Sequence, residues 1–392
     1  MLLKVLQEHH FDSFQLAGEA TSYYWLPLFI QFLKDETWSR FNPQLFLLNA
    51  RWVHWYKLSK SPSHKTDKVD PNDIAQYLRE RKPSIPWKYD PHWLSLRFHT
   101  RLRTHLVKSR TREKNYLNLF LFLTYSSYGN GKPFSNYLGP TSKKLLTQPE
   151  LMQEFLDLPL DELADKLQDV SKHRLLDPRK NASILKNVLS DRYPMDTVMT
   201  KTIQDALDIL INTIQCYDEQ ISHVEARIKE LVQSDEYPEV AWLESVPGVG
   251  RVIACGVAAE IGGIARFTQL PRWDEKRKVW RARTSSEVAD AVSKYAGLWW
   301  PKNSSGKFEA DQLHLSREGN AYLRFYVLEA ADRMRQFIPS FSSYYSKKYH
   351  QSSIHKHKRA LVLTGTKCLD LFVALLRHQE FYRPKEGDKP LP

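Results

Sequence analysis

Three acidic residues in the first part of the chain have the types and spacing needed to hold a divalent metal ion. Asp67 and Asp70 lie three residues apart at the expected start of a helix, and Glu19 follows a probable strand. Carboxylate oxygens are ligands that hard divalent cations prefer, and such an ion can hold a phosphodiester for attack. The three residues together therefore indicate phosphoryl-transfer chemistry.

A serine far downstream is a candidate nucleophile for the same reaction. Ser305 stands in the polar run Asn303-Ser304-Ser305-Gly306, and a serine hydroxyl can attack phosphorus when it is activated. The cations Lys302 and Arg317 would lower the cost of bringing a phosphate close. A serine in such a run is more often an ordinary solvated loop residue. Ser304 is the alternative nucleophile, although no glycine follows it directly.

The acidic residues also have a structural interpretation. Asp70 precedes Pro71, so its carboxylate could cap the helix by accepting backbone N–H groups. Asp67 lies three residues before Asp70, between Lys65 and Lys68. At that position it would not cap the helix, and solvent would already satisfy its carboxylate. Glu19 by itself is uninformative, and only the ordered set favours a metal site.

The elements expected around these residues alternate between strand and helix. We predict strands at 14–17 and 44–48, and a helix from Pro71 through Leu78. Ser22 is expected to cap an amphipathic helix that runs through Phe32. Strand, helix, strand and helix over the first ninety residues indicate part of an α/β layer.

The middle of the chain carries a long heptad pattern. Apolar residues alternate steps of four and three along a predicted helix, which is typical of a coiled coil. A partner helix is expected at roughly 93–122, and self-association through the pattern is predicted. Segment 141–195 suggests short helices without a recognisable motif. The heptad residues are Ile203, Leu207, Leu210, Ile214, Tyr217, Ile221, Val224, Ile228 and Leu231.

The last third opens with a glycine turn between two predicted helices. The run Ser245-Val246-Pro247-Gly248-Val249-Gly250 precedes a helix of small residues. This pattern is typical of a helix-hairpin-helix motif, in which Gly248 and Gly250 let backbone N–H groups approach a DNA phosphate. An ordinary tight turn between helices fits the same run.

Positive charge is in excess, with 57 Lys and Arg against 45 Asp and Glu. This surplus favours nucleic acid over a membrane surface as partner. Segment 272–283 mixes cations with Trp273 and Trp280, which could stack on bases. The run from Lys347 to Arg359 is also basic and is left unassigned. A predicted helix with Glu113 as its one acid carries seven cations: Arg97, Arg101, Arg103, Lys108, Arg110, Arg112 and Lys114. A solvated charged face is the alternative for both the helix and 272–283.

These motifs, in this order, resemble the transposases of the insertion sequence 110 type, which are relatives of the Piv-type DNA invertases. The family pattern of Glu-Ala-Thr followed by Lys-Thr-Asp-x-x-Asp is matched by Glu19, Lys65, Asp67 and Asp70. Ser305 falls on the family's nucleophilic serine. Further matches in the family's order are Ser245–Gly250, Tyr295-Ala296-Gly297-Leu298, Ser316-Arg317-Glu318-Gly319-Asn320 and Leu323-Arg324.

The resemblance implies an α+β multidomain fold. A partial RuvC-like (ribonuclease-H-like) domain with a DEDD site is expected at 1–92. A coiled-coil helical region is expected at 93–233, with an insertion at about 141–198. A mostly α-helical domain with the helix-hairpin-helix-like motif and the serine is expected at 234–392. The family's first Asp lies on a strand well before the glutamate, so the N-terminus is expected to be truncated, without that strand and that ligand.

The resemblance also implies a function, that of a DNA transposase or recombinase. Mg²⁺ (or Mn²⁺) held by Glu19, Asp67 and Asp70 would polarise the scissile phosphate. Ser305 would attack it, which forms a phosphoserine link, breaks the bond to the neighbouring nucleotide and leaves a free 3′ hydroxyl. The expected partners are DNA, a guide (bridge) RNA and further copies of the chain, in dimers and tetramers formed through the coiled coil. Two alternatives remain: a metal-dependent structure-selective nuclease that uses water, and an inactive nucleic-acid-binding remnant.

The expected location is the cytoplasm, in association with the nucleoid. The three cysteines, Cys216, Cys255 and Cys368, are scattered, which suits a reducing compartment. The N-terminus turns polar too early for a signal peptide, and no apolar run reaches membrane-spanning length.

Overall fold

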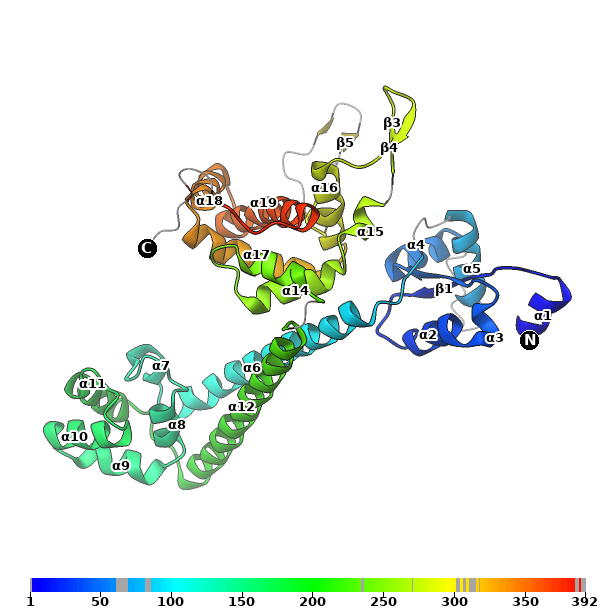
Figure 1. The fold of residues 1–392 in the computed structure, drawn as a ribbon. Helices are drawn as coiled ribbons and strands as arrows, with labels where there is room; N and C mark the ends of the chain where they lie inside the picture. Colours follow the sequence, from blue (N-terminus) through cyan, green and yellow to red (C-terminus); the bar gives the residue numbers. More distant parts are fainter. Residues whose placement is uncertain are drawn as a thin grey trace. The chain divides into compact units, whose positions relative to one another are not determined.

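The computed structural model describes residues 2–60, 70–81, 86–233, 236–269, 271–300, 304–305, 308–309, 315–316, 318–384 and 388. Most of these residues are helical, and the few strands are short. The chain divides into two compact units (Figure 1). The first comprises Met1–Leu94 and Ala265–Arg283, and the second comprises Ser95–Ile264 and Thr284–Pro392.

The first unit contains a small α/β layer. Strands β1 (Gln15–Glu19) and β2 (Gln44–Leu48) pair in parallel, with Leu16 opposite Leu45. Both predicted strands are confirmed, although β1 ends two residues later than expected. The remaining elements are α1 (Leu2–Glu8), α2 (Leu26–Lys34), α3 (Glu36–Ser39), α4 (Ala50–Lys60), α5 (Asp70–Arg81), α15 (Ala265–Thr268), β3 (Arg272–Asp274) and β4 (Val279–Arg281).

Alternate residues of the strand pair face opposite helical layers. Phe46 and Leu48 pack with residues of α4 and α5, including Val53 and Leu78. Leu45 and Leu47 pack on the other side with Phe29, Phe32 and Trp38 of α2 and α3. The pleat of a strand sends successive side chains to opposite faces, which explains why β2 is apolar throughout.

The expected capping role of Ser22 is wrong. Ser22 has φ of 52°, in the left-handed region, and its carbonyl accepts a hydrogen bond from the Trp25 indole N–H at 3.0 Å. Helix α2 begins one residue after Trp25, without a side-chain cap, and Pro27 lies in its first turn. Proline is tolerated there because the first N–H groups of a helix lack partners inside it.

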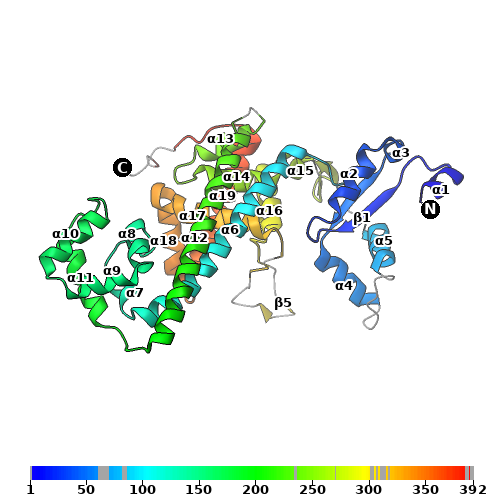
Figure 2. The same ribbon diagram turned by 90° about the horizontal axis from the view of Figure 1, so that it is seen from below.

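A rod of two long antiparallel helices dominates the first part of the second unit. They are α6 (Pro91–Thr124), whose first turn belongs to the first unit, and α12 (Thr197–Leu231). Arg103 pairs with Glu225 at 2.6 Å, and Arg110 pairs with Asp218 at 2.5 Å. The partners step by seven residues in opposite directions, as an antiparallel heptad register requires. Both views show the helices side by side (Figure 1, Figure 2).

The predicted heptad face is buried within this one chain. Tyr217 and Leu231 are half-buried, and the other seven heptad residues are buried. Ile211 and Ile214 share one apolar cluster with Leu117 and Leu121 of α6. The partner helix expected at 93–122 is therefore α6. The seam joins two segments of the same chain, which corrects the expectation that it serves self-association.

A lobe of short helices connects the two helices of the rod. Its apolar residues, among them Phe155 and Leu185, belong to the same cluster as Leu121 and Leu207 of the rod. The lobe therefore shares its core with one end of the rod. Its helices are α7 (Tyr128–Gly131), α8 (Pro140–Leu146), α9 (Pro149–Asp157), α10 (Leu160–Val170) and α11 (Pro178–Ser190).

The C-terminal part of the second unit is a helical bundle. Its elements are α13 (Pro238–Glu244), α14 (Arg251–Ile261), α16 (Ser285–Ala296), β5 (Ser304–Ser305), β6 (Phe308–Glu309), α17 (Ala321–Phe337), α18 (Pro339–Gln351) and α19 (Lys356–His378). Among the described helices, none has both the length and the apolar character needed to cross a bilayer.

One glycine lets three helices of this unit pack closely. A Cβ on Gly256 of α14 would lie 2.4 Å from the ring of Tyr326 on α17, so no larger residue fits there. The Tyr326 hydroxyl donates to the Thr100 carbonyl at 2.9 Å and lies 2.8 Å from the Thr104 hydroxyl, both on α6. Burial raises the pKa of Tyr326 to about 12, so the hydroxyl keeps its proton at neutral pH.

Candidate functional site

Glu19 lies at the carboxyl edge of the parallel strand pair. It is the last residue of β1 and stands opposite Leu48, which faces α4 and α5. Its carboxylate accepts a hydrogen bond from Nζ of Lys57 on α4 at 3.1 Å, and a quarter of the Glu19 side chain is exposed. The carboxyl edge of parallel strands is where α/β layers bind their ligands. Glu19 thus offers one oxygen donor there.

The two aspartates are placed less completely. Asp70 begins α5, which contacts β1, but only its backbone is described. Asp67 and Lys65 lie outside the described residues. Within the part of the chain that the structure describes, no three His, Cys, Asp or Glu side chains converge as a metal site. The metal and helix-cap interpretations of Asp70 both stay predictions.

Ser305 lies in a segment whose two ends are held together. Its backbone in β5 pairs with Phe308 of β6, while Lys302 and Arg317 lie outside the described residues. The Ser316 N–H donates to the Trp299 carbonyl at 3.0 Å. This hydrogen bond joins the two ends of the segment that carries the serine, and we call the joined ends the stem.

A second backbone contact of the stem joins the motifs at 295–298 and 316–320. The Asn320 N–H donates to the Tyr295 carbonyl at 2.7 Å. Gly319 has φ of 146°, and a Cβ there would lie 2.4 Å from the Tyr295 carbonyl oxygen and 2.7 Å from the Gly297 nitrogen. The glycine is therefore required by this close approach. The motifs at 295–298 and 316–320 thus meet at the base of the serine segment.

A buried carboxylate accepts a hydrogen bond from Asn320 of the stem. Glu260 of α14 is fully buried, and Arg101 of α6 binds both of its oxygens at 2.7 Å. Asn320 donates to Glu260 Oε2 at 2.7 Å, while its own Oδ1 accepts from the N–H groups of Tyr322 and Leu323 at the start of α17. Burying a charge is costly unless it is paired and hydrogen-bonded, and Glu260 is both.

The arginines of α6 have partners inside the chain. Arg97 donates twice to the Ala259 carbonyl, at 3.0 and 2.8 Å, and lies 3.8 Å from Glu260. With Arg101 on Glu260, Arg103 on Glu225 and Arg110 on Asp218, these guanidinium groups bind protein acceptors. Arg97 and Arg101 therefore hold α6 to α14, and phosphate contact by either stays a prediction.

The other cations of α6 have different surroundings. Arg112 pairs with Glu113 at 3.2 Å and is largely exposed. Lys108 lies over the rings of Tyr322 and Phe325, at 5.7 and 6.0 Å from their centroids. Burial lowers the pKa of Lys114. Nucleic-acid contact by Lys108 and Arg112 stays a prediction.

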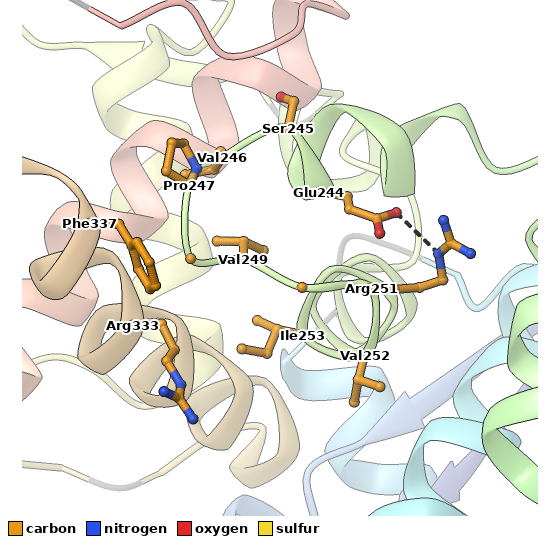
Figure 3. A pocket seen from close by; sticks show the side chains of 12 residues that line it. Glu244, Ser245, Val246, Pro247, Val249, Arg251, Val252, Ile253, Arg333 and Phe337 are labelled. Atoms are coloured by element: carbon orange, nitrogen blue, oxygen red, sulfur yellow. Dashed lines mark hydrogen bonds and ion pairs between the residues drawn. The ribbon is translucent and has the colours of Figure 1, made fainter. Parts of the chain in front are cut away.

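The glycine turn joins α13 to α14 and borders a shallow hollow of about 630 Å³ (Figure 3). Gly248 has φ of 87°, and a Cβ there would lie 2.9 Å from the Phe337 ring and 3.0 Å from the Arg333 backbone. Gly250 has an ordinary φ of −77°, and a Cβ built on it would have no atom within 4 Å. Packing on α17 therefore requires Gly248, whereas nothing described around Gly250 requires a glycine.

Two family models match the chain. Residues 1–125 match the model described as a transposase with the IS110-type DEDD domain, and residues 280–346 match the model described as transposase IS116/IS110/IS902 family. In both segments the chain is similar to transposases of the IS110 family. The transposase for insertion sequence element IS1111A of Coxiella burnetii (strain RSA 493 / Nine Mile phase I) is 26% identical over 187 residues. That match spans 47% of this chain and 45% of the relative, which is less than half of either length.

A small hairpin formed by β3 and β4 presents two indoles. Trp273 of β3 and Trp280 of β4 are directly opposite, with ring centroids 5.5 Å apart, and both are exposed. Asp274 accepts hydrogen bonds from the N–H groups of Arg277 and Lys276, and these hold its pKa below the ordinary value. Stacking of the indoles on bases stays a prediction.

Sequence reasoning missed Glu260 and its partners. The helix around Glu260 contains mostly small apolar residues, and a lone acid among them was the available signal. Asn320 belongs to a noticed motif, but its contact with Glu260 spans 60 residues of sequence. Arg101 belongs to the predicted basic helix, and nucleic-acid contact was predicted for it rather than a contact with a carboxylate of the same chain. Only the tertiary structure brings these three residues together.

Proposed function

We propose that this chain is a DNA transposase of the IS110 family that cuts and rejoins strands through a phosphoserine intermediate, with a divalent metal and a structured guide RNA. The observation that carries the proposal is the position of Glu19. Its carboxylate lies at the carboxyl edge of β1 and β2, on the side of α5, which Asp70 begins. That arrangement fits the start of a shared carboxylate site.

The proposed ligands of Mg²⁺ or Mn²⁺ are Glu19, Asp67 and Asp70. When bound, the ion would polarise the scissile phosphate and offset its developing charge. Lys57 neutralises Glu19 at 3.1 Å and would have to release it on metal binding. Asp67→Asn is expected to abolish Mg²⁺-dependent cleavage while the fold persists.

Asp70→Asn separates the two interpretations of that residue. If Asp70 holds metal, cleavage should be lost. If it only caps α5, cleavage should survive and stability should change little, because Asn caps a helix about as well as Asp, whereas Asp70→Ala should cost about 1 kcal/mol. Circular dichroism melting and a cleavage assay on the same preparation measure both quantities.

Ser305 is the proposed nucleophile. A neutral serine attacks poorly, so it needs a base nearby and donors that stabilise charge on the phosphate. The closed stem at Trp299–Ser316 and Tyr295–Asn320 supports this role because it fixes both ends of the serine segment. No proposed metal ligand is near Ser305 in sequence, so the active site would be composite.

A denaturing gel with end-labelled DNA, Mg²⁺ and guide RNA tests the serine. Ser305→Ala should keep its fold and nucleic-acid binding but form no covalent protein–DNA adduct, whereas the matched control Ser304→Ala should retain the adduct. An adduct that survives Ser305→Ala and disappears with Ser304→Ala would identify the other serine. Cleavage by both variants without any adduct would favour a hydrolytic nuclease. Omitting the guide RNA should reduce adduct formation on specific sites.

The turn at Gly248–Gly250 is proposed to contact a DNA phosphate. Support comes from the open space at Gly250 and from Arg333, which lines the same hollow (Figure 3). Gly250→Ala should leave stability unchanged and weaken duplex binding several-fold, because the methyl group occupies the approach path. Gly248→Ala is the contrasting variant, expected to destabilise by about 1–3 kcal/mol through backbone strain and overpacking. If Gly250→Ala binds duplex as tightly as the parent, the turn does not contact DNA at Gly250 and only connects the two helices.

Assembly into dimers or tetramers is also proposed. Because α6 occupies the heptad seam, a second copy would need another face of the rod. Tyr116, Leu119 and Phe122 follow one another at three-residue spacing on α6 and are exposed, and Ile209 of α12 is 65% exposed at the register position opposite Leu119. Leu119→Asp with Ile209→Asp should lower the sedimentation mass without unfolding the chain. An unchanged mass would exclude this face.

A further inference from the structure

A long stretch near the C-terminus lacks acidic residues. Between Asp332 and Asp370 the sequence has no Asp or Glu. The same stretch holds eight Lys and Arg residues and three histidines: Arg333, Arg335, Lys347, Lys348, Lys356, Lys358, Arg359, Lys367, His350, His355 and His357. Most of it lies beyond the residues that the family model matches.

The stretch folds into a helical hairpin, α18 packed on α19. Its inner side is apolar, with Phe341, Ala360 and Cys368 buried. Lysines and histidines gather at the connected ends of the two helices, where 352–355 link them. Lys347, Lys356 and Lys358 are exposed there, and Lys348 is half-exposed. The tip of the hairpin is therefore a solvent-facing basic surface.

Aromatic rings, rather than carboxylates, surround these cations. Lys348 lies over the Tyr344 ring at 5.6 Å, and Lys356 lies over the Tyr349 ring at 5.9 Å. The Tyr345 hydroxyl is 2.7 Å from Nδ1 of His357. Cation–π contacts restrict a lysine without neutralising its charge. Among the described residues, no carboxylate forms an ion pair with a lysine of the tip.

One acid from the C-terminal end of the chain binds at the opposite end of α18. Asp388 accepts hydrogen bonds from the N–H and hydroxyl of Ser340, in the first turn of that helix. This carboxylate therefore does not pair with the lysines of the tip.

Helix stability does not explain this arrangement. Lys356, His357, Lys358 and Arg359 form the first turn of α19, which holds no acidic residue. The helix dipole places partial positive charge at this end, so cations here reduce stability. Repulsion between the neighbouring cations adds to that cost. A surface that is unfavourable in the free protein becomes favourable when a polyanion covers it.

We infer that the tip of the α18–α19 hairpin binds the sugar-phosphate backbone of nucleic acid without sequence preference. The inference rests on the proposed function, and it adds a surface that the family's motifs do not include. Lysines dominate the tip, and a lysine acts as a point charge toward phosphate rather than as a reader of base edges. Charge complementarity therefore favours backbone contact.

The test compares two variants with four charges removed from each. The tip variant carries Lys347→Gln, Lys348→Gln, Lys356→Gln and Lys358→Gln. The control carries Lys144→Gln, Lys172→Gln, Lys180→Gln and Lys201→Gln, all exposed lysines in and beside the lobe. Binding of a 30-base-pair duplex of arbitrary sequence is followed by fluorescence anisotropy over a range of NaCl concentrations.

The tip variant should bind more than tenfold more weakly near physiological salt. The slope of log K against log salt should flatten by roughly three, since each lost phosphate contact contributes about 0.9. The control should change neither quantity appreciably. Single-stranded RNA should show the same difference, because it presents the same phosphates.

Three outcomes would overturn the inference. If the unmodified chain binds duplex and both variants match it, the tip is not the surface, although the proposed function stands. If the unmodified chain binds neither duplex nor RNA, both proposals fail. If the tip variant keeps nucleic-acid binding but loses binding to anionic lipid vesicles, the surface belongs to a membrane.

Discussion

The α6–α12 rod and the α18–α19 hairpin carry similar positive charge in sequence but use it in opposite ways. On α6, Arg101, Arg103 and Arg110 each meet a carboxylate from a distant part of the chain. At the tip of α18–α19, the lysines face rings and solvent. The rod uses its cations to join helices, whereas the hairpin leaves them available to an external anion.

This difference shows that local charge density does not locate a nucleic-acid surface. The helix at 91–124 was the stronger candidate because it contains one acid among seven cations. Its neutralising acids, Asp218, Glu225 and Glu260, lie more than 100 residues away. The α18–α19 stretch differs because it lacks acids over a longer run, and no described carboxylate forms an ion pair with the lysines at its tip.

The largest expected effect concerns the apolar seam of the rod. Ile214→Asp would place a charge at a fully buried position, which should destabilise the second unit by several kcal/mol, about 4 or more. Urea unfolding measures the loss, with Asn212→Asp on the exposed side of α12 as control. Normal stability together with a lower sedimentation mass would mean that the seam binds another chain.

The next effect concerns the buried ion pair. Glu260→Gln would leave Arg101 and Arg97 without their anionic partner, which should cost about 3 kcal/mol. Arg101→Gln should be similarly destabilising and should leave the salt slope of DNA binding unchanged. If Arg101→Gln instead flattens that slope at normal stability, α6 is a phosphate-binding surface after all.

A smaller effect is expected from a half-exposed pair of the rod. Arg103→Glu or Glu225→Arg alone should cost about 1 kcal/mol or less, and the double exchange should recover most of it. Thermal unfolding of the parent, the two single variants and the double variant measures the interaction energy of Arg103 with Glu225. Failure of the double variant to recover would show that Arg103 and Glu225 do not contribute through their mutual contact.

The smallest effect, and the one of opposite sign, belongs to the hairpin. Lys358→Glu should raise stability by about 0.5 kcal/mol, because an acid suits the first turn of α19 better than a cation. It should also weaken duplex binding. Lys180→Glu, which changes charge equally in the first turn of α11, controls for net charge. A Lys358→Glu protein that is less stable than the parent would contradict the unfavourable placement of the cations.

Local patterns predicted the elements well. The parallel strands, α5, α6 and α12 follow from period-two and heptad spacing, which depend on near neighbours in sequence. The capping role of Ser22 was wrong because a left-handed residue and the Trp25 side chain rearrange that turn. The seam and its partner segment at roughly 93–122 were predicted, but the spacing could not decide whether the seam also joins two copies of the chain, since a heptad face fits a helix of the same chain or of another.

The candidate site could be predicted only in part. Glu19 is the last residue of the strand that it was expected to follow, and the roles of Asp67, Asp70 and Ser305 stay predictions. The Glu260 network could not be anticipated, because Arg101, Glu260 and Asn320 lie on three separate helices or their caps. Ion pairs across such distances depend on the packing of the whole unit.

The antiparallel rod also constrains the order in which the chain folds. Arg103 and Glu225 are 122 residues apart, whereas Leu121 and Leu207, which share the lobe core, are closer in sequence. Closing a long loop before any contact forms is entropically costly, and a folded lobe removes most of that cost. We therefore expect α6 and α12 to form their contacts first at the end next to the lobe and last at the end next to the helical bundle. Leu121→Ala should slow refolding, whereas Glu225→Gln should chiefly speed unfolding.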